Sequence, residues 1–220
     1  MRIKLNKSQM LVGLVCILIF SIGLNIYNIF RLESYKYRIG QQSYAKIEDI
    51  RQRNESNMEI LNKSTDSRNI RNEEILKLYK NYDVMSSDII ELWQQYSDYK
   101  DNSLTLLSKR IDTNKVIQND INGKIKDYMF STLTKEMKNE KSKFLLENDD
   151  LKCFEAMKDM SERIYCYFNE FNSDKLKGCL GEDKEKKIIK QNYWIDMLNG
   201  IYNISDDYTD IKWNIEAVEN

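Results

Sequence analysis

The sequence predicts an all-α protein, in which an N-terminal transmembrane helix continues into an elongated antiparallel bundle of five to six helices. Three observations support this fold class. Residues 10–30 are almost entirely apolar and carry no charge. The 220-residue chain contains no proline and only 7 glycines, so it lacks the residues that most often break helices and form tight turns. Residues 75–99 place apolar side chains at alternating spacings of three and four, which is the period of an α-helix.

Residues 10–30 are long enough to cross a bilayer, because a helix of this length spans roughly 32 Å at about 1.5 Å per residue. A short basic tail, residues 1–9, precedes them and carries Arg2, Lys4 and Lys7. A cleaved signal peptide also begins with basic residues, but this apolar run exceeds the usual core of about 7–15 residues and lacks a small-residue cleavage site. We therefore expect an uncleaved signal anchor, with the lipid bilayer as a partner.

The charges on the two flanks of the anchor are nearly balanced, because Arg31, Lys36, Arg38 and Lys46 follow it. The excess of basic residues that marks the cytoplasmic side therefore decides little. A short tail followed by one long domain is the usual arrangement of a signal anchor. We expect a single-pass protein of the cell membrane with a cytoplasmic N-terminus and an extracytoplasmic C-terminal domain.

The chain beyond the anchor divides into two expected parts. Residues 31–66 have few apolar positions and only Gly40 as a strong stop signal, so they should form a stalk-like helix that continues out of the membrane. A polar turn is expected over residues 62–69. Residues 67–220 should form the helical bundle domain.

The clearest amphipathic helix of the bundle covers residues 75–99. Its apolar stripe consists of Ile75, Leu78, Tyr82, Met85, Ile89, Leu92, Tyr96 and Tyr99. The spacing is that of a coiled coil, but Tyr79 and Trp93 widen the stripe, which favours a bundle helix over a two-stranded zipper. We expect Ile89 and Leu92 to face the core.

Weaker patterns predict the remaining elements, which are helices over residues 104–128, 151–171, 182–203 and 205–218 and a loop over residues 172–181. Ser205 is expected to cap the last helix. In the first of these helices, Asn114 and Gln118 have two interpretations. They could form a buried polar layer that sets the register, or they could face water while Val116 and Ile117 face the core.

Composition excludes several functional classes. The net charge is −1, from 34 basic and 35 acidic side chains that are interspersed, so we expect no nucleic acid partner. The chain has no histidine, which excludes Ser-His-Asp and Cys-His nucleophiles. It also has no phosphate-binding loop and no Cys-x-x-Cys spacing. We therefore expect no catalytic residues, no metal ligands and no cofactor. Carboxylates are abundant, but solvated helix surfaces account for them.

Three cysteines lie outside the anchor, at Cys153, Cys166 and Cys179. Cys166 is expected near the end of its helix and Cys179 in the loop that follows, so a Cys166–Cys179 disulfide is conceivable if the domain faces an oxidising compartment. Cys153 would then be left over. The odd number favours buried free thiols over a disulfide framework.

Aromatic residues are concentrated in the C-terminal half, at Tyr165, Tyr167, Phe168, Phe171, Tyr193, Trp194, Tyr202 and Trp213. Such residues can line a ligand pocket. Helix-spaced aromatic residues more often fill a core, and we favour that interpretation.

The anchor, the segment YRIGQQSY at residues 37–44 and the segment LWQQY at residues 92–96 resemble uncharacterised single-pass membrane proteins of AT-rich Gram-positive bacteria. This resemblance implies a location and a helical shape, but no activity. We therefore expect a non-enzymatic, membrane-anchored interaction or scaffold protein of the cell envelope, which acts through a protein partner or self-association. The alternative is a ligand-binding, sensor-type helical bundle, and a carboxylate-dependent envelope enzyme ranks last.

Overall fold

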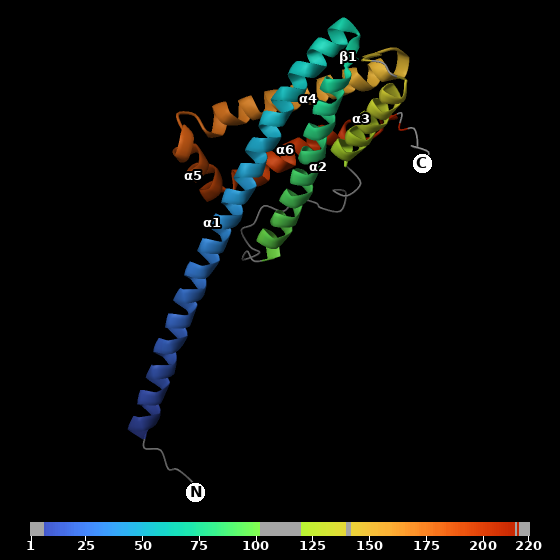
Figure 1. Ribbon diagram of the computed structural model, residues 1–220. Coiled ribbons are helices and arrows are strands. Elements are labelled where there is room, and N and C mark those ends of the chain that lie inside the picture. The colour runs from blue at the N-terminus through green and yellow to red at the C-terminus, as the bar shows by residue number, and fades with distance from the viewer. Residues whose placement is uncertain (1–6, 102–119, 140–141, 214, 216–220) are drawn as a thin grey trace. The chain divides into compact units, whose positions relative to one another are not determined.

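The computed structural model describes residues 7–101, 120–139, 142–213 and 215. In these residues the chain forms six α-helices and one two-stranded antiparallel sheet (Figure 1). The helices are α1 (Lys7–Ser67), α2 (Asn72–Asp101), α3 (Ile121–Lys138), α4 (Asn148–Lys175), α5 (Gly181–Gln191) and α6 (Tyr193–Asp206), and the strands are β1 (Asn69–Arg71) and β2 (Lys143–Leu145). The predicted all-α helical bundle is confirmed, and the short sheet is an element that the sequence pattern did not indicate.

The chain divides into two compact units, residues 1–39 and residues 40–220. In the first unit, α1 carries the apolar residues 10–30 with their large side chains exposed, from 48% for Val15 to 72% for Ile17. This helix is long and apolar enough to cross a membrane. Apolar side chains exposed around a whole helix are unfavourable in water, and a membrane span is one structure in which such a helix occurs.

In the second unit, residues 40–67 of α1 pack antiparallel to α2. Near the beginning of this stretch the Ser43 hydroxyl donates a hydrogen bond to Oε1 of Gln95, at 2.6 Å. Further along α1, Nδ2 of Asn81 donates to Oδ1 of Asn57, at 2.7 Å. Contacts thus move backwards along α2 as they move forwards along α1, which defines the antiparallel pairing.

The stalk expected over residues 31–66 overlaps this packed region. From Gly40 onward, α1 belongs to the second unit. There its Ile47 and Ile50 are completely buried. Much of the helix that was expected to be a stalk therefore contributes to the core of the bundle.

The polar turn expected over residues 62–69 is shorter than predicted, because α1 continues to Ser67 and β1 begins at Asn69. Between them, Arg68 adopts a left-handed backbone conformation with φ 51°. Strand β1 pairs antiparallel with β2, and the backbone N–H of Leu146 donates to the Arg68 carbonyl oxygen at 3.0 Å. The sheet therefore ties the turn after α1 to the segment before α4.

The stripe predicted for α2 forms its buried face. The completely or nearly completely buried members are Ile75, Leu78, Tyr82, Met85, Leu92 and Tyr96. The expectation for Leu92 is confirmed, whereas Ile89 is only half-buried. The predicted polar layer of Asn114 and Gln118 lies outside the described residues.

Helix α3 lies antiparallel to α2. The rings of Tyr79 and Phe130 are 5.7 Å apart between centroids. Towards the other end of the pair, the Ser86 hydroxyl donates to Oδ1 of Asp120 at 3.0 Å. Asp120 also accepts a hydrogen bond from the backbone N–H of Gly123, so it caps the start of α3.

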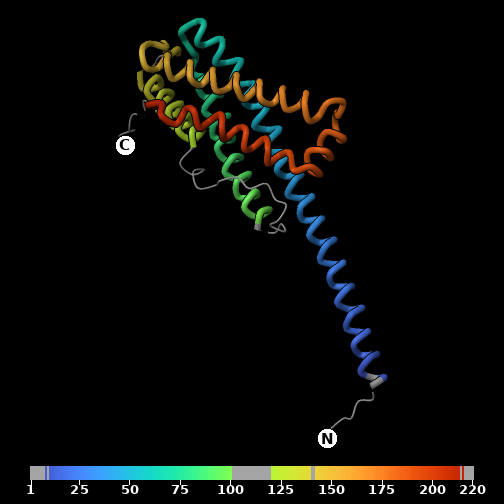
Figure 2. Tube along the Cα trace, turned by 180° about the vertical axis from the view of Figure 1, so that it is seen from behind, coloured from blue at the N-terminus to red at the C-terminus, as the bar shows by residue number. Residues whose placement is uncertain are grey.

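Helices α4 and α6 form a second layer that crosses α2 and the C-terminal part of α1 (Figures 1 and 2). The Tyr167 hydroxyl on α4 donates to the Asp196 carbonyl oxygen on α6, at 2.8 Å. Nδ2 of Asn54 on α1 donates to the Ser161 carbonyl oxygen on α4, also at 2.8 Å. These contacts join the two layers through hydrogen bonds as well as apolar packing.

The single helix predicted over residues 182–203 is wrong, because the structure has two helices there. Asn192 adopts φ 54° and separates α5 from α6. Asparagine tolerates this left-handed conformation better than most residues, which is the physical reason for the break. The loop expected over residues 172–181 is also shorter than predicted, because α4 continues to Lys175.

The helix predicted over residues 205–218 is wrong for its described part. Ser205 lies within α6, and its hydroxyl donates to the Ile201 carbonyl oxygen at 2.7 Å, so it is not an N-cap. Residues 211–213 have no regular secondary structure. In this segment Trp213 lies beside α3, with its ring centroid 5.7 Å from that of Tyr128.

One half of a capping box marks the start of α2, with Glu74 as the acceptor. The Arg71 backbone N–H donates to Oε2 of Glu74 at 3.1 Å, and the Arg71 guanidinium donates to Oε1 at 3.0 Å. The Lys63 amine donates to the same Oε1 at 3.1 Å. The Arg71 guanidinium is the main cause that lowers the pKa of Glu74 to about 2, with further contributions from the Arg71 backbone and Lys63 and with partial burial opposing them.

Replacing this carboxylate is expected to destabilise the fold in a pH-dependent way. Glu74→Gln should lower the free energy of unfolding by about 1–2 kcal/mol at pH 7, since the capping acceptor loses its charge. Because the pKa of Glu74 is lower in the folded state, its ionised carboxylate stabilises the fold at pH values above the unfolded pKa of about 4.3. This contribution is lost as the pH falls towards 2. The difference between wild type and variant should therefore close between about pH 4 and pH 2 in denaturant titrations of the detergent-solubilised chain.

The matched control is Glu73→Gln, which removes an exposed carboxylate that contacts the outer side of the same Arg71 guanidinium at 2.5 Å. This change should stay within about 0.5 kcal/mol. Equal effects of the two substitutions would contradict the capping role of Glu74.

Candidate functional site

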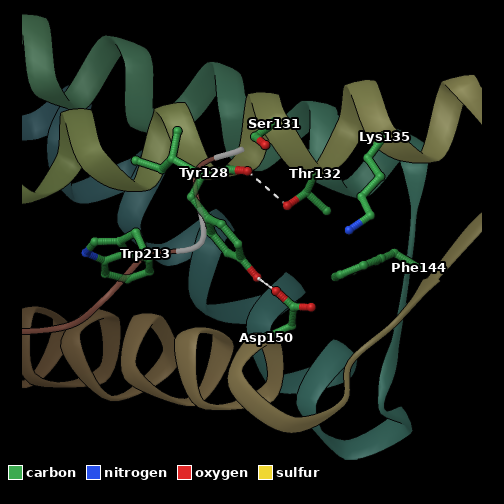
Figure 3. A pocket seen from close by; sticks show the side chains of 8 residues that line it. Tyr128, Ser131, Thr132, Lys135, Phe144, Asp150 and Trp213 are labelled. Carbon is green, nitrogen blue, oxygen red and sulfur yellow. Dashed lines mark hydrogen bonds between the residues drawn. The ribbon is translucent and has the colours of Figure 1, made fainter. Parts of the chain in front are cut away.

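A pocket of about 330 Å³ opens beside α3, β2, the first turn of α4 and the segment after α6 (Figure 3). The residues that shape its chemistry are Tyr128, Thr132, Lys135, Phe144, Asp150 and Trp213. Its volume lies at the lower end of the range of about 300–1,000 Å³ that is typical of small-molecule sites. Because it combines aromatic walls with a buried tyrosine and a carboxylate, we consider it the candidate functional site of the second unit.

Helix α3 supplies one wall of the pocket. Tyr128, Thr132 and Lys135 follow at spacings of four and three, so they lie on one face of this helix. The Thr132 hydroxyl donates to the Tyr128 carbonyl oxygen at 2.9 Å, which holds the threonine against its own helix (Figure 3). The Lys135 side chain extends from the same face towards Phe144 (Figure 3).

The opposite walls come from β2 and α4, whose positions depend on the pairing of β1 with β2. Phe144 lies on β2 and pairs with Ile70 of β1. Helix α4 begins at Asn148, three residues after β2 ends, so Asp150 stands in its first turn. A carboxylate is favourable there, because the N-terminus of a helix carries a partial positive charge.

The centre of the site is a hydrogen bond between Tyr128 and Asp150. The Tyr128 hydroxyl donates to Oδ1 of Asp150 at 2.7 Å (Figure 3). The Tyr128 ring is almost completely buried and contacts Phe154 and Trp213, at centroid distances of 6.3 and 5.7 Å. Burial, followed by the hydrogen bond and negative charge of Asp150, raises the pKa of Tyr128 far above its ordinary value of 10.

This arrangement is suited to binding. The Tyr128 phenol is protonated at neutral pH, as tyrosine ordinarily is, and burial raises its pKa further, so it donates a hydrogen bond and does not act as a base. Lys135 and Asp150 bring opposite charges to two walls, and Phe144 and Trp213 add aromatic surface. In the part of the chain that the structure describes, no group of three or more acidic or cysteine side chains is placed to hold a metal ion.

None of the predicted cysteines lines this pocket, although the buried Cys153 lies on α4 three residues after Asp150. All four cysteines are free thiols, with Cys166 exposed and Cys179 half-buried. Because α4 continues to Lys175, Cys166 lies about 14 Å before the end of its helix. The Cys166–Cys179 disulfide stays a prediction.

The predicted aromatic residues include both core residues and a residue that lines the pocket. Trp194 and Phe168 are buried in the core, whereas Trp213 lines the pocket. Asp150 and Lys135 carried no recognisable signal in the sequence. Asp150 belonged to a polar break between helices, and Lys135 is one of many lysines on a helical surface.

Removing the central hydroxyl is expected to weaken the fold modestly. Tyr128→Phe should lower the free energy of unfolding by about 1 kcal/mol at pH 7, since one hydrogen bond to a carboxylate is lost. Because the pKa of Tyr128 is higher in the folded state, its protonated phenol stabilises the fold at pH values below the unfolded pKa of about 10. This contribution is lost as the pH rises further. The difference between wild type and variant should therefore shrink above about pH 10 in unfolding titrations.

Tyr165→Phe is the matched control, because this tyrosine is 36% exposed on α4. It should change the free energy of unfolding by less than about 0.5 kcal/mol at any pH. A difference for Tyr128→Phe that does not depend on pH would contradict the proposed environment of the phenol.

Comparison of the chain with known protein families, with curated proteins and with solved structures gives no match. What the chain does must therefore be inferred from its own residues.

Proposed function

We propose that the chain is a non-enzymatic scaffold protein of the cell envelope, anchored in the membrane by residues 10–30. Its helical domain binds a protein partner or a second copy of itself. The observation that carries this proposal is the combination of the uncharged apolar residues 10–30, whose large side chains are exposed, with a separate exposed apolar surface on the bundle. The first feature is suited to insertion into lipid, and the second is suited to binding another protein.

The anchor is proposed to be a single span with the basic tail in the cytoplasm and residues 40–220 outside. Every large apolar side chain described between residues 10 and 30 is about half exposed or more. Full exposure of one such side chain to water costs roughly 1.5–3 kcal/mol relative to its burial, and a bilayer removes this cost.

The second feature is the α2–α3 surface, which we define by Leu76, Tyr79, Phe130 and Met137. Leu76 precedes Tyr79 by three residues and Met137 follows Phe130 by seven, so each pair shares one helix face. The Tyr79 and Phe130 rings are in contact across the two helices. Phe130 is 48% exposed and Met137 is 65% exposed.

This surface supports protein binding because of its residue types. Aromatic residues and methionine are enriched in protein interfaces, and contiguous exposed apolar surface commonly marks an interaction site. Isolated exposed apolar residues carry no such implication. Here two neighbouring helices contribute to the same surface.

Topology is tested with a C-terminal reporter that is active only outside the cytoplasm. We expect activity from the full chain and none from the same fusion lacking residues 10–30, which should become soluble. An inactive reporter on a correctly inserted full chain would overturn the extracytoplasmic placement.

Partner binding is tested by affinity purification of the crosslinked full chain from its native membrane. We expect a stoichiometric partner or a dimer, and Phe130→Asp should reduce its recovery by about tenfold or more, because a charge would enter the apolar contact. Tyr165→Asp changes an aromatic residue on another helix and should leave the recovery unchanged. Thermal melts must show that both variants remain folded. A lone monomer, or equal recovery with Phe130→Asp, would contradict the proposal.

The pocket favours a second candidate function, a ligand-binding helical bundle. Its volume of about 330 Å³, its aromatic walls and its two opposite charges are features of small-molecule sites. This function does not compete with scaffolding, since the pocket and the α2–α3 surface use different residues.

A further inference from the structure

Helices α1, α2 and α4 meet at a polar junction inside the bundle, which we define by Asn54, Asn57, Asn81, Tyr82 and Ser161. Each of these residues is at most 7% exposed. Burial of a polar group without a hydrogen-bond partner is unfavourable, so buried polar groups in proteins are almost always paired. Every donor and acceptor of this junction therefore needs a partner.

Some groups of the junction bond to one another directly. Nδ2 of Asn54 on α1 donates to the Ser161 carbonyl oxygen on α4, at 2.8 Å. Nδ2 of Asn81 on α2 donates to Oδ1 of Asn57 on α1, at 2.7 Å. Nδ2 of Asn57 in turn lies 3.6 Å from the sulfur of Met85 on α2. These contacts gather side chains of three helices into one cluster.

Three buried polar atoms of the junction have no hydrogen-bond partner among the described residues. They are Oδ1 of Asn54 and the hydroxyl oxygens of Tyr82 and Ser161. Burial raises the pKa of Tyr82 to about 12, and the neighbouring side chains of Ser161 and Asn57 partly oppose this rise. Asn54 is held beside Ser161 by its bond to the Ser161 backbone. The three unpaired atoms therefore belong to one small region of the core.

Neighbouring polar atoms that do not bond to one another directly are commonly bridged by water. A water molecule offers two donors and two acceptors. Oδ1 of Asn54 can only accept a hydrogen bond, whereas the hydroxyl groups of Tyr82 and Ser161 can each donate one. One water molecule satisfies all three atoms, and about three hydrogen bonds are typical of a buried water.

A cation fits this junction less well than water does. The five side chains that define the junction are neutral, so none of them would offset a buried charge. The Arg53 guanidinium also brings positive charge to the edge of the junction, because it donates to Oδ1 of Asn81 at 3.2 Å. An organic ligand would need an opening, and Asn54, Tyr82 and Ser161 are at most 1% exposed.

We infer that the junction of α1, α2 and α4 binds one internal water molecule. The water donates a hydrogen bond to Oδ1 of Asn54 and accepts hydrogen bonds from the Tyr82 and Ser161 hydroxyls. It thereby joins the three helices next to the direct bond between Asn57 and Asn81. This site uses none of the residues of the anchor, the pocket or the α2–α3 surface, so it goes beyond the proposed function and does not rest on it.

The test is magnetic relaxation dispersion of isotope-labelled water oxygen in a solution of the full chain in detergent micelles. This measurement counts the water molecules that stay bound for longer than the protein takes to tumble. Because it follows oxygen, exchange of hydroxyl protons does not affect it. We expect at least one long-lived water in the wild-type chain. A folded wild-type chain without such a water would overturn the inference.

A double variant assigns the water to the junction. Tyr82→Phe combined with Ser161→Ala removes both hydroxyls and adds no volume, so only Oδ1 of Asn54 remains as a partner. A buried water needs about two to four polar partners, and the count should therefore fall by about one. The matched control combines Tyr165→Phe with Ser173→Ala, which makes the same changes at exposed positions of α4. It should leave the count unchanged.

Thermal melts provide a second readout. If the water is bound, the double variant loses hydrogen bonds and should melt about 2–4 °C or more below the wild type. If the two hydroxyls were unpaired in the folded chain, their removal would leave the melting temperature unchanged or raise it, because burial of an unpaired polar group is unfavourable. That result, or an unchanged water count in the folded double variant, would overturn the inference.

Discussion

The buried amide pair of Asn57 and Asn81 is the contact on which the arrangement of the second unit depends. Both side chains are almost inaccessible, and Nδ2 of Asn81 donates to Oδ1 of Asn57 in the interface of α1 and α2. Sliding one helix by a turn would leave two amides without partners in an apolar core, at a cost of about 1–3 kcal/mol for each. The pair therefore selects one register among several that apolar packing alone would permit. Asn54, one turn earlier, extends the same polar layer to the Ser161 carbonyl oxygen of α4.

The position of the pocket follows from this register. Once α1 and α2 are aligned, the turn between them places β1 at one end of the bundle, where β2 pairs with it. The sheet fixes Phe144 and, three residues after β2, the beginning of α4. Asp150 then lies next to Tyr128 of α3, and the hydrogen bond between them joins α4 to α3. We therefore expect a change in the α1–α2 interface to alter the pocket, although no residue of α1 or α2 lines the pocket.

Helix α3 separates the two proposed activities by using different faces. Tyr128, Thr132 and Lys135 face the pocket, whereas Phe130 and Met137 belong to the exposed α2–α3 surface. The proposed ligand and the proposed protein partner would therefore not compete for a side chain. Both would contact α3.

The sequence by itself determined the features that depend on local order. The uncharged run of residues 10–30 and the stripe of α2 are periodic or compositional properties, and both correspond to elements of the structure. Tertiary structure decided the helix ends at Arg68 and Asn192, because their left-handed conformations occur without the glycine that usually signals them. It also decided the sheet and the pocket. Tyr128 and Asp150 are 22 residues apart and meet only because non-local packing brings α3 and α4 together, which no spacing along the chain encodes.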